Sequence, residues 1–281
     1  MGPLQKRLWT AVRQTVAGVA FLLAIGVVEY AVMPWVIQGW EEGAYWLLKK
    51  DTLLHTALAV LAAIAAGALL HYMKFGSRDV RPEGPADEIL WWSKLERLFH
   101  WIFVPVVILL LVSGVQIFLA GGGLPDATTR LMRRLHFNEL FVLFGLILFV
   151  LWFPEALPRR YDARWLLRSG GYLGFKGHLK AGKFNAGQKI WFWLYVFFGT
   201  AMVLTGHQLQ YNYSRLDPPY YPLLVVHLVA ATVFLASMVL HIYLSVIVVR
   251  GALAGMVRGR IGRHAAKRHH SEARLLKPDP P

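Results

Sequence analysis

Residues 221–249 read YPLLVVHLVAATVFLASMVLHIYLSVIVV and contain no Asp, Glu, Lys or Arg. A run of about 20 apolar residues is long enough to cross the hydrocarbon core of a bilayer as a helix. Backbone N–H and C=O groups in lipid must be bonded within their own segment, so such a run crosses the membrane as an α-helix. This stretch alone therefore predicts a helical membrane protein.

Five further apolar stretches of spanning length precede this one. The predicted spans are residues 16–37, 52–73, 98–120, 135–153, 190–209 and 221–249. The first follows basic residues as a signal peptide would, but it is too long for that and lacks a small-residue cleavage site, so we expect it to be retained. The predicted fold class is all-α, a polytopic membrane bundle of six transmembrane helices.

The composition supports a membrane protein and narrows its chemistry. The 281 residues are 56% hydrophobic and only 16% charged, with a formal net charge of +14, whereas soluble domains carry about 25% charged residues. The chain has no cysteine, which excludes disulfides, Cys-ligated zinc, covalent c-type haem and iron–sulfur clusters held by this chain alone. We assign the basic excess to loops flanking the membrane and expect no nucleic-acid partner.

The distribution of positive charge predicts the orientation. The N-terminus, the second and fourth connections and the C-terminal tail carry 24 Lys and Arg residues, and the other three connections carry six. Loops rich in Lys and Arg stay in the cytoplasm. Both termini are therefore predicted to be cytoplasmic.

The chain divides into three predicted parts. Residues 1–88 form an N-terminal two-helix membrane extension, and residues 89–249 form a four-helix core with a cytoplasmic loop at 154–189. Residues 250–281 form a basic cytoplasmic tail. The tail is expected either to be solvated near anionic lipid headgroups or to dock on a partner.

Two histidines on the last span suggest a pair of cofactor sites. His227 and His241 are fourteen residues apart, which at about 100° per residue places them within about 40° of the same helix face, and about 21 Å apart along the axis. One imidazole therefore lies near each side of the bilayer. Two cofactors stacked across the membrane would need this arrangement.

Partner histidines are expected at matching depths on other helices. His100 lies near the cytoplasmic start of the third span, and His136 opens the fourth span at the outer side. Antiparallel helices then pair His100 with His241 and His136 with His227, and imidazoles on facing helices suit haem iron. Hydrogen bonds between helices are the alternative. Gly114 lies at the depth of the outer pair, where a missing side chain would admit either a porphyrin or a closely packed helix.

Three other membrane histidines are weaker candidates. His55 and His71 are sixteen residues apart and so face nearly opposite ways; we interpret both as structural. His207 is the main rival to His136 or His227. A transporter whose histidines relay protons is a more distant alternative function.

Several motifs together resemble one known family. The segment GKFNAGQK at 182–189, followed by WFW at 191–193, resembles the signature loop of formate dehydrogenase gamma subunits, the cytochrome b membrane subunits of respiratory formate dehydrogenases. The resemblance covers about residues 89 to 271. Supporting motifs are ERLFHW at 96–101, SG at 113–114, RYDARWL at 160–166, VH at 226–227, HIY at 241–243 and AKRHH at 266–270.

This resemblance implies specific sites. It implies two b-type haems, the inner held by His100 and His241 and the outer by His136 and His227. It implies a quinone pocket at Asn185, Gly187 and Gln188, with His241 adjacent. The alternative for Asn185 is that it caps the following helix, a role that asparagine favours.

The resemblance also implies the partners. We expect a bacterial inner-membrane protein that passes electrons from a periplasmic iron–sulfur beta subunit, itself served by a molybdenum- or tungsten-containing alpha subunit, to quinone. This chain carries no residues for formate chemistry itself. The alternative is a cytochrome b anchor for a hydrogenase or thiosulfate reductase.

Overall fold

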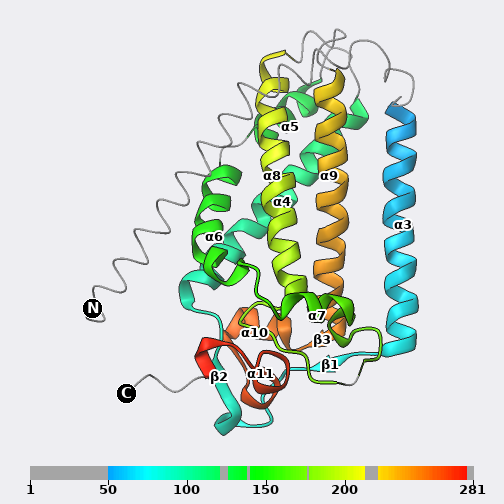
Figure 1. Ribbon diagram of the computed structural model, residues 1–281. Helices are drawn as coiled ribbons and strands as arrows, with labels where there is room; N and C mark the ends of the chain where they lie inside the picture. The colour runs from blue at the N-terminus through cyan, green and yellow to red at the C-terminus, as the bar shows by residue number, and fades with distance from the viewer. Residues whose placement is uncertain (1–49, 121–125, 138–139, 176, 213–220, 277–281) are drawn as a thin grey trace. The chain divides into compact units, whose positions relative to one another are not determined.

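The computed structural model describes residues 50–120, 126–137, 140–175, 177–212 and 221–276 (Figure 1). Within these residues, five segments are long and apolar enough to cross a membrane: Ala57–Phe75, Lys94–Ala120, Ala127–Ala156, Ala186–Gln210 and Pro222–Val248. They correspond to the second to sixth predicted spans. The predicted span at 16–37 lies outside the described residues. The helical membrane fold class is confirmed.

The long helices differ little from the predicted spans. They are α3 (Lys50–Phe75), α4 (Lys94–Ala120), α6 (Leu140–Ala156), α8 (Ala186–Asn212) and α9 (Tyr221–Ile242). Helix α9 continues directly into a π-helical segment, η5 (Tyr243–Val248). Wider turns of this kind are frequent at functional sites, and this one begins two residues after His241.

The fourth predicted span differs from the structure at its start. A separate helix, α5 (Ala127–His136), precedes α6, and the Asp126 side chain caps it by accepting a hydrogen bond from the Thr129 N–H at 2.6 Å. Arginines at 130, 133 and 134 make this segment polar, so it does not continue the apolar run of α6. His136 is the last residue of α5, and α5 and α6 both lie within the spanning segment Ala127–Ala156.

The chain forms two compact units. Among the described residues, the first unit contains 50–53, 98–120, 126–137, 140–153, 199–212 and 221–231. The second contains 54–97, 154–175, 177–198 and 232–276. All five long helices, α3, α4, α6, α8 and α9, contribute residues to both units. His136 and His227 belong to the first unit, whereas the loop at 154–189 and His241 belong to the second.

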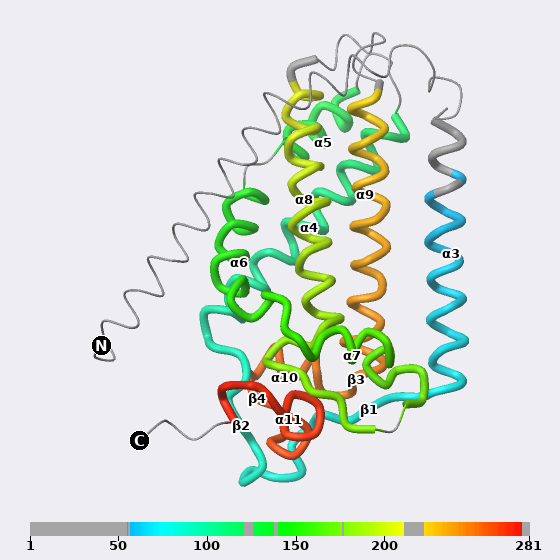
Figure 2. Tube along the Cα trace, in the orientation of Figure 1, coloured from blue at the N-terminus to red at the C-terminus, as the bar shows by residue number. Residues whose placement is uncertain are grey.

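Short strands in the second unit join segments that are distant in sequence. Strand β1 (Arg78–Asp79), directly after α3, pairs in parallel with β3 (Val249–Arg250), directly after η5 (Figure 2). Strand β2 (Glu88–Leu90) pairs antiparallel with β4 (Arg260–Gly262). The second pairing covers a small core of Ile89, Trp91, Ile261, Ala266 and Ala273.

The C-terminal segment is folded, in contrast to the solvated tail expected from the sequence. It contains α10 (Ala252–Arg258), α11 (Arg263–His269) and η6 (Arg274–Leu276). The Glu272 N–H donates to the Ala181 carbonyl at 2.9 Å, and His270 Nδ1 donates to the Gly182 carbonyl at 2.8 Å. Ala266, which is 0% exposed, packs with Ile89 and Trp91 in the small core beside β2.

Two further short helices complete that loop. Helix α7 (Asp162–Leu167) and the 3-10 turn η3 (Ser169–Gly171) lie between α6 and α8. Trp165 of α7 packs in a second core with Leu179, Ala181 and Ala186. The described residues of the predicted loop at 154–189 belong to the second unit.

Candidate haem-binding and quinone-binding residues

His136 and His227 face each other in the first unit. Their ring centroids are 6.1 Å apart and their planes cross at 65°. Metal–imidazole bonds are about 2 Å long, so two imidazoles on opposite sides of one metal place their centroids about 6 Å apart. The structure thus brings together the two residues that the sequence pairs at the outer side, at a separation that suits a shared iron.

Hydroxyl groups on two other helices hold these rings. Ser113 Oγ lies 3.0 Å from His136 Nδ1, and Thr205 Oγ1 lies 2.9 Å from His227 Nδ1. Each hydroxyl donates its own proton to the carbonyl four residues earlier, at 2.6 Å in both cases. The hydroxyl oxygens therefore accept from the imidazoles.

This hydrogen bonding fixes the tautomer of both histidines. The proton sits on Nδ1, and for His136 the Leu110 carbonyl at 3.0 Å requires the same assignment because a carbonyl only accepts. The Nε2 lone pair of each ring is left for a metal. A metal-bound histidine ordinarily donates its other N–H to a protein acceptor in this way.

A glycine follows each of the two hydroxyl residues. A Cβ at Gly114 would lie 2.9 Å from His136 Cε1, and a Cβ at Gly206 would lie 3.3 Å from His227 Cε1. Each position thus admits an imidazole against the bare helix backbone. The neighbour at Gly114 is the His136 ring, whereas the sequence analysis expected either a porphyrin or a closely packed helix there. Together with the Nδ1-protonated rings, these cradles fit a flat porphyrin with two axial imidazoles.

Residues Thr205 and Gly206 were not among the sequence candidates. The Ser113-Gly114 step was identified through the family resemblance, and Thr205-Gly206 repeats the same hydroxyl–glycine pair on α8. A search for a second such pair near a membrane histidine would have found it.

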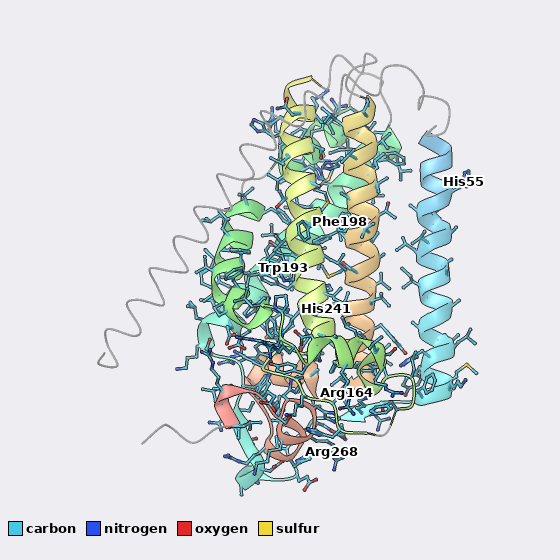
Figure 3. All side chains as sticks on the ribbon, viewed as in Figure 1. His55, Arg164, Trp193, Phe198, His241 and Arg268 are labelled. Carbon is cyan, nitrogen blue, oxygen red and sulfur yellow. The ribbon has the colours of Figure 1, made fainter. Side chains whose placement is uncertain are left out.

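The other predicted pair, His100 and His241, falls in different compact units. His100 packs edge-on to Trp101, with centroids 5.0 Å apart, and lies 6.3 Å from the Trp152 ring. His241 is labelled in Figure 3. The inner pairing remains a prediction.

Trp191 stacks on His241 and was also missed from the sequence. Their centroids are 4.7 Å apart with planes at 28°, and Trp191 stacks in addition on Tyr195 at 6.2 Å and 15°. Its Nε1 is buried and makes no hydrogen bond within the described part of the chain. The nearby Trp193 Nε1 donates to the Ala156 carbonyl at 3.1 Å. Trp191 lies four residues after Gly187, on the same face of α8, which is a signal that the sequence contained.

Asn185 and Gln188 cap the start of α8. The Gln188 N–H donates to Asn185 Oδ1 at 2.9 Å, and the Asn185 N–H donates to Gln188 Oε1 at 3.0 Å. This reciprocal pair is a capping box, so the helix-capping alternative for Asn185 is realised. Each side-chain oxygen accepts one of these two hydrogen bonds. The side-chain NH2 group of each residue is the donor that could bind a ligand.

Gly187 is required by a neighbouring tryptophan. A Cβ at this position would lie 2.9 Å from Trp165 Cη2 and 3.3 Å from Asn185 Oδ1. The sequence prediction gave a different reason, the approach of a quinone ring to the backbone. Packing against Trp165 alone excludes any side chain here.

Two ion pairs hold the loop before α8. Lys183 Nζ lies 2.6 Å from Glu96 Oε1, and Lys189 Nζ lies 2.8 Å from Asp162 Oδ2. The side chains of the second pair are only 7% and 12% exposed. Lys183 also lies over the Trp92 ring, at 4.9 Å. These contacts fix Asn185 and Gln188 relative to α4 and α7.

The remaining membrane histidines have other surroundings. His71 Nε2 donates to the Tyr172 carbonyl at 3.0 Å, so its Nδ1 accepts from the Tyr243 hydroxyl at 2.6 Å. This contact joins α3 to η5 and to the loop, as the structural interpretation of His71 requires. His55 and His207 are exposed, and Figure 3 labels His55 on α3. His207 is therefore a poor rival to the facing pair.

Comparisons with known proteins agree with the resemblance found in the motifs. Residues 91–259 match the family described as prokaryotic cytochrome b561. The cytochrome b556 subunit of the nitrate-inducible formate dehydrogenase of Escherichia coli (strain K12) is 28% identical over 189 residues, which are 63% of this chain and 85% of that protein. A second cytochrome b556 subunit of formate dehydrogenase from the same strain is 28% identical over 192 residues, 66% of this chain and 90% of that protein.

A formate dehydrogenase cytochrome b556 subunit of Haemophilus influenzae is also similar, at 27% identity over 189 residues, 62% of this chain and 77% of that protein. The predicted resemblance to formate dehydrogenase cytochrome subunits is thus confirmed. The family match covers more than half of the chain and includes all four predicted haem-ligating histidines. The chain belongs to the prokaryotic cytochrome b561 family, a family of helical membrane bundles that bind haem b.

Proposed function

We propose that this chain is the cytochrome b membrane anchor of a respiratory formate dehydrogenase and passes electrons from a partner iron–sulfur subunit to quinone. The observation that carries the proposal is the facing pair of His136 and His227, each with Nδ1 protonated and each against a glycine. The similarity to formate dehydrogenase cytochrome subunits specifies the type of complex.

The histidines would hold two haems. His136 and His227 are the ligands of the outer haem, and His100 and His241 are the ligands of the inner one. Haem b, when bound, supplies reversible one-electron transfer. Ser113 and Thr205 orient the outer imidazoles and raise their basicity through the Nδ1 hydrogen bonds. Trp191 restricts rotation of the His241 ring by stacking on it.

The quinone would bind beside His241 at the start of α8. Quinone carbonyl oxygens accept hydrogen bonds, and the side-chain NH2 groups of Asn185 and Gln188 are the donors left by the capping box. Gly187 is the third predicted member of this pocket, and the Trp165 ring lies against its backbone. Trp191, one turn further along α8 and stacked on His241, carries a buried N–H that is a further candidate donor.

The expected partner subunits are those that would deliver electrons from formate to the haems. A periplasmic iron–sulfur beta subunit, served by a molybdenum- or tungsten-containing alpha subunit, would dock at the outer side of a bacterial inner membrane. The 24 Lys and Arg residues on the opposite side support cytoplasmic termini. Quinone would then be reduced near the cytoplasm, where protons are available.

Purification of the native complex through a tag on this chain tests the proposal. We expect iron–sulfur and molybdenum or tungsten subunits to copurify, formate to reduce the haems, and added quinone to reoxidise them. Copurification of hydrogenase or thiosulfate reductase subunits would reject the formate assignment. Absence of haem from the purified chain would reject electron transfer altogether.

A further inference from the structure

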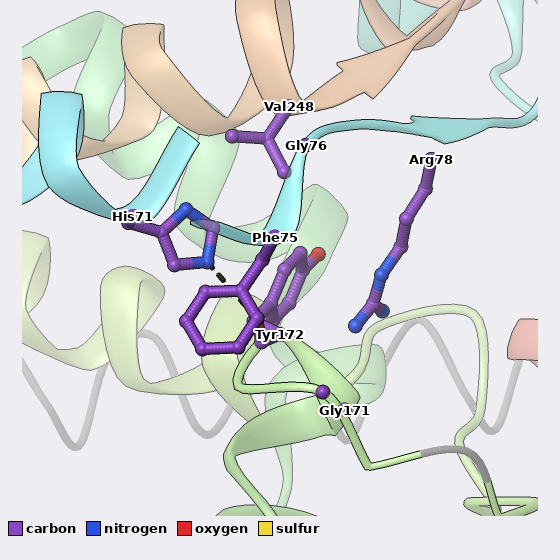
Figure 4. Close-up of a pocket in the computed structure, with 8 residues that line it drawn as sticks. His71, Phe75, Gly76, Arg78, Gly171, Tyr172 and Val248 are labelled. Carbon is purple, nitrogen blue, oxygen red and sulfur yellow. Dashed lines mark hydrogen bonds between the residues drawn. The ribbon is translucent and has the colours of Figure 1, made fainter. Parts of the chain in front are cut away.

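A small cavity in the second unit is not used by the proposed function. Its volume is ≈ 70 Å³, and its walls include His71, Phe75, Arg78, Gly171, Tyr172 and Val248 (Figure 4). By this measure a cavity needs about 10–15 Å³ to hold one water molecule, so this one has room for a small ionic group.

Arg78 places an unneutralised positive charge at this cavity. Its guanidinium lies 3.9 Å from the centroid of the Tyr172 ring, and Nη1 donates to the Gly170 carbonyl at 2.9 Å. Among the described residues no carboxylate pairs with Arg78, whereas Arg81, three residues later, is paired with Asp79. Burial lowers the pKa of Arg78, which shows that its charge is partly removed from water.

The other residues lining the cavity determine its shape, and Arg78 is the side chain that could bind an anion there. Gly171 has a left-handed φ of 74°, and a Cβ there would lie 3.2 Å from Arg78 Nη2. Both nitrogens of His71 are occupied by Tyr172 and Tyr243, so His71 is a wall of the cavity. Among the described residues, no hydrogen-bond acceptor is assigned to Nη2 or Nε of Arg78. A guanidinium is well matched to phosphate oxygens.

The cavity lies where two membrane spans end. The span in α3 ends at Phe75 and the span in α9 and η5 ends at Val248, and both residues line the cavity. Phospholipid phosphates lie at this level of a bilayer. In the last turns of α3, on the membrane side of Phe75, three apolar side chains are exposed. They are Leu69, Leu70 and Met73, which are 60%, 66% and 73% exposed. This surface suits acyl chains.

We propose that this cavity binds the phosphate of an anionic phospholipid, with Arg78 as its ligand and the acyl chains along the exposed face of α3. The bound lipid would connect α3 to the loop at 170–174 at the membrane boundary. The site would also explain why Arg78, and not its neighbour Arg81, is left without an acidic partner. The inference is independent of haem and quinone.

Native mass spectrometry of the purified complex, with phosphatidylglycerol and phosphatidylcholine supplied in turn, tests the site. We expect one tightly held phosphatidylglycerol in the wild type and in Arg81→Gln, and its loss from Arg78→Gln, because a charged hydrogen bond to phosphate is worth about tenfold or more in affinity. Unchanged haem content in each variant shows that the protein is folded.

A second measurement on the wild type covers the case in which Arg78→Gln does not fold. Delipidated complex should be stabilised against heat by phosphatidylglycerol vesicles, and neither phosphatidylcholine vesicles nor inorganic phosphate should replace them. Equal stabilisation by inorganic phosphate would assign the cavity to a free anion and overturn the lipid proposal. Equal lipid retention by wild type and Arg78→Gln would overturn it as well.

Discussion

At the residue scale, the same pair of neighbours, a hydroxyl residue followed by glycine, packs against each of the two facing histidines. Ser113-Gly114 on α4 and Thr205-Gly206 on α8 each provide a hydroxyl that accepts from Nδ1 and a glycine that admits the ring. In both cases the hydroxyl donates its own proton to a backbone carbonyl of the same helix. The Ser113 and Thr205 hydroxyls thus set the tautomers of His136 and His227, and this role needs no charged side chain.

We expect Thr205→Val to change the redox potential of the outer haem. The substitution keeps the side-chain shape and removes the Thr205 hydroxyl as an acceptor for the His227 ring, leaving the backbone hydrogen bond to Met202. The imidazole then becomes a weaker donor to ferric iron. A loss of about 1 kcal/mol corresponds to a rise of about 40 mV for a one-electron couple. Potentiometric titration of the haem spectrum measures it. Ser237→Ala is the matched control, because that hydroxyl donates only to Phe234 of its own helix; an unchanged potential in Thr205→Val would contradict the role.

We expect Gly114→Val to remove the outer haem. A Cβ at Gly114 would lie 2.9 Å from the His136 ring, so the larger side chain displaces the ligand. Haem content measured as the pyridine haemochrome should fall by about half if the chain carries two haems. Gly67→Val is the control, since a Cβ at Gly67 meets nothing within 4 Å. Full haem content in Gly114→Val would show that the cradle is not needed.

The Trp191 N–H gives a sharper test of the quinone pocket. Trp191→Phe keeps the stack on His241 and removes the buried donor, so we expect up to about a tenfold rise in the KM for quinone with haem content unchanged. Trp193→Phe, which removes a donor already bonded to Ala156, should leave that KM as in the wild type. Equal KM values for both variants and the wild type would remove Trp191 from the pocket.

At the element scale, the loop before α8 depends on buried charge pairs. Lys189→Met leaves Asp162 buried without its cation, and breaking such a pair costs about 3–5 kcal/mol. Lys180→Met breaks a pair with Glu272 in which the lysine is 63% exposed, and exposed pairs contribute about 0–1 kcal/mol. In thermal unfolding of the complex, the midpoint temperature of Lys189→Met should be clearly lower than that of Lys180→Met. Similar midpoints would mean that the Lys189–Asp162 pair does not hold the loop.

The C-terminal segment should weaken in acid. Burial, and then the charge of Arg78, lowers the pKa of His269 from 6.5 to about 4, so the folded protein binds fewer protons than the unfolded chain between these values. The stability that His269 contributes is therefore full above about pH 6.5 and declines as the pH falls toward 4. Hydrogen exchange of α11 between pH 7 and 4.5 measures this loss. His269→Gln should reduce the pH dependence; an unchanged slope would exclude His269 as its source.

The elements were predictable to different degrees. The described long helices agree with the predicted spans because spanning the bilayer needs only an apolar run of sufficient length. The break between α5 and α6 and the folded tail were not predicted. Helices as short as α5, α10 and α11 are marginal alone and depend on tertiary contacts, such as those of His270 and Glu272 with the loop.

At the scale of the whole molecule, long-range contacts limit what one sequence can show. The facing pair of His136 and His227 was predicted from depth and helix rotation, and the structure brings the two rings together. The contact of His71 with Tyr243, 172 residues apart, follows no local pattern. The same holds for the β1–β3 pairing and for the cavity beside Arg78.

The haem content of the purified complex, determined by the pyridine haemochrome in the wild type and in His227→Ala and His241→Ala, tests the account most directly. We expect two b-type haems per chain in the wild type. His227→Ala should retain only the inner haem and His241→Ala only the outer one, with distinct spectra. A wild type without haem, or two haems surviving in either variant, would contradict the assignment of these histidines to two stacked sites.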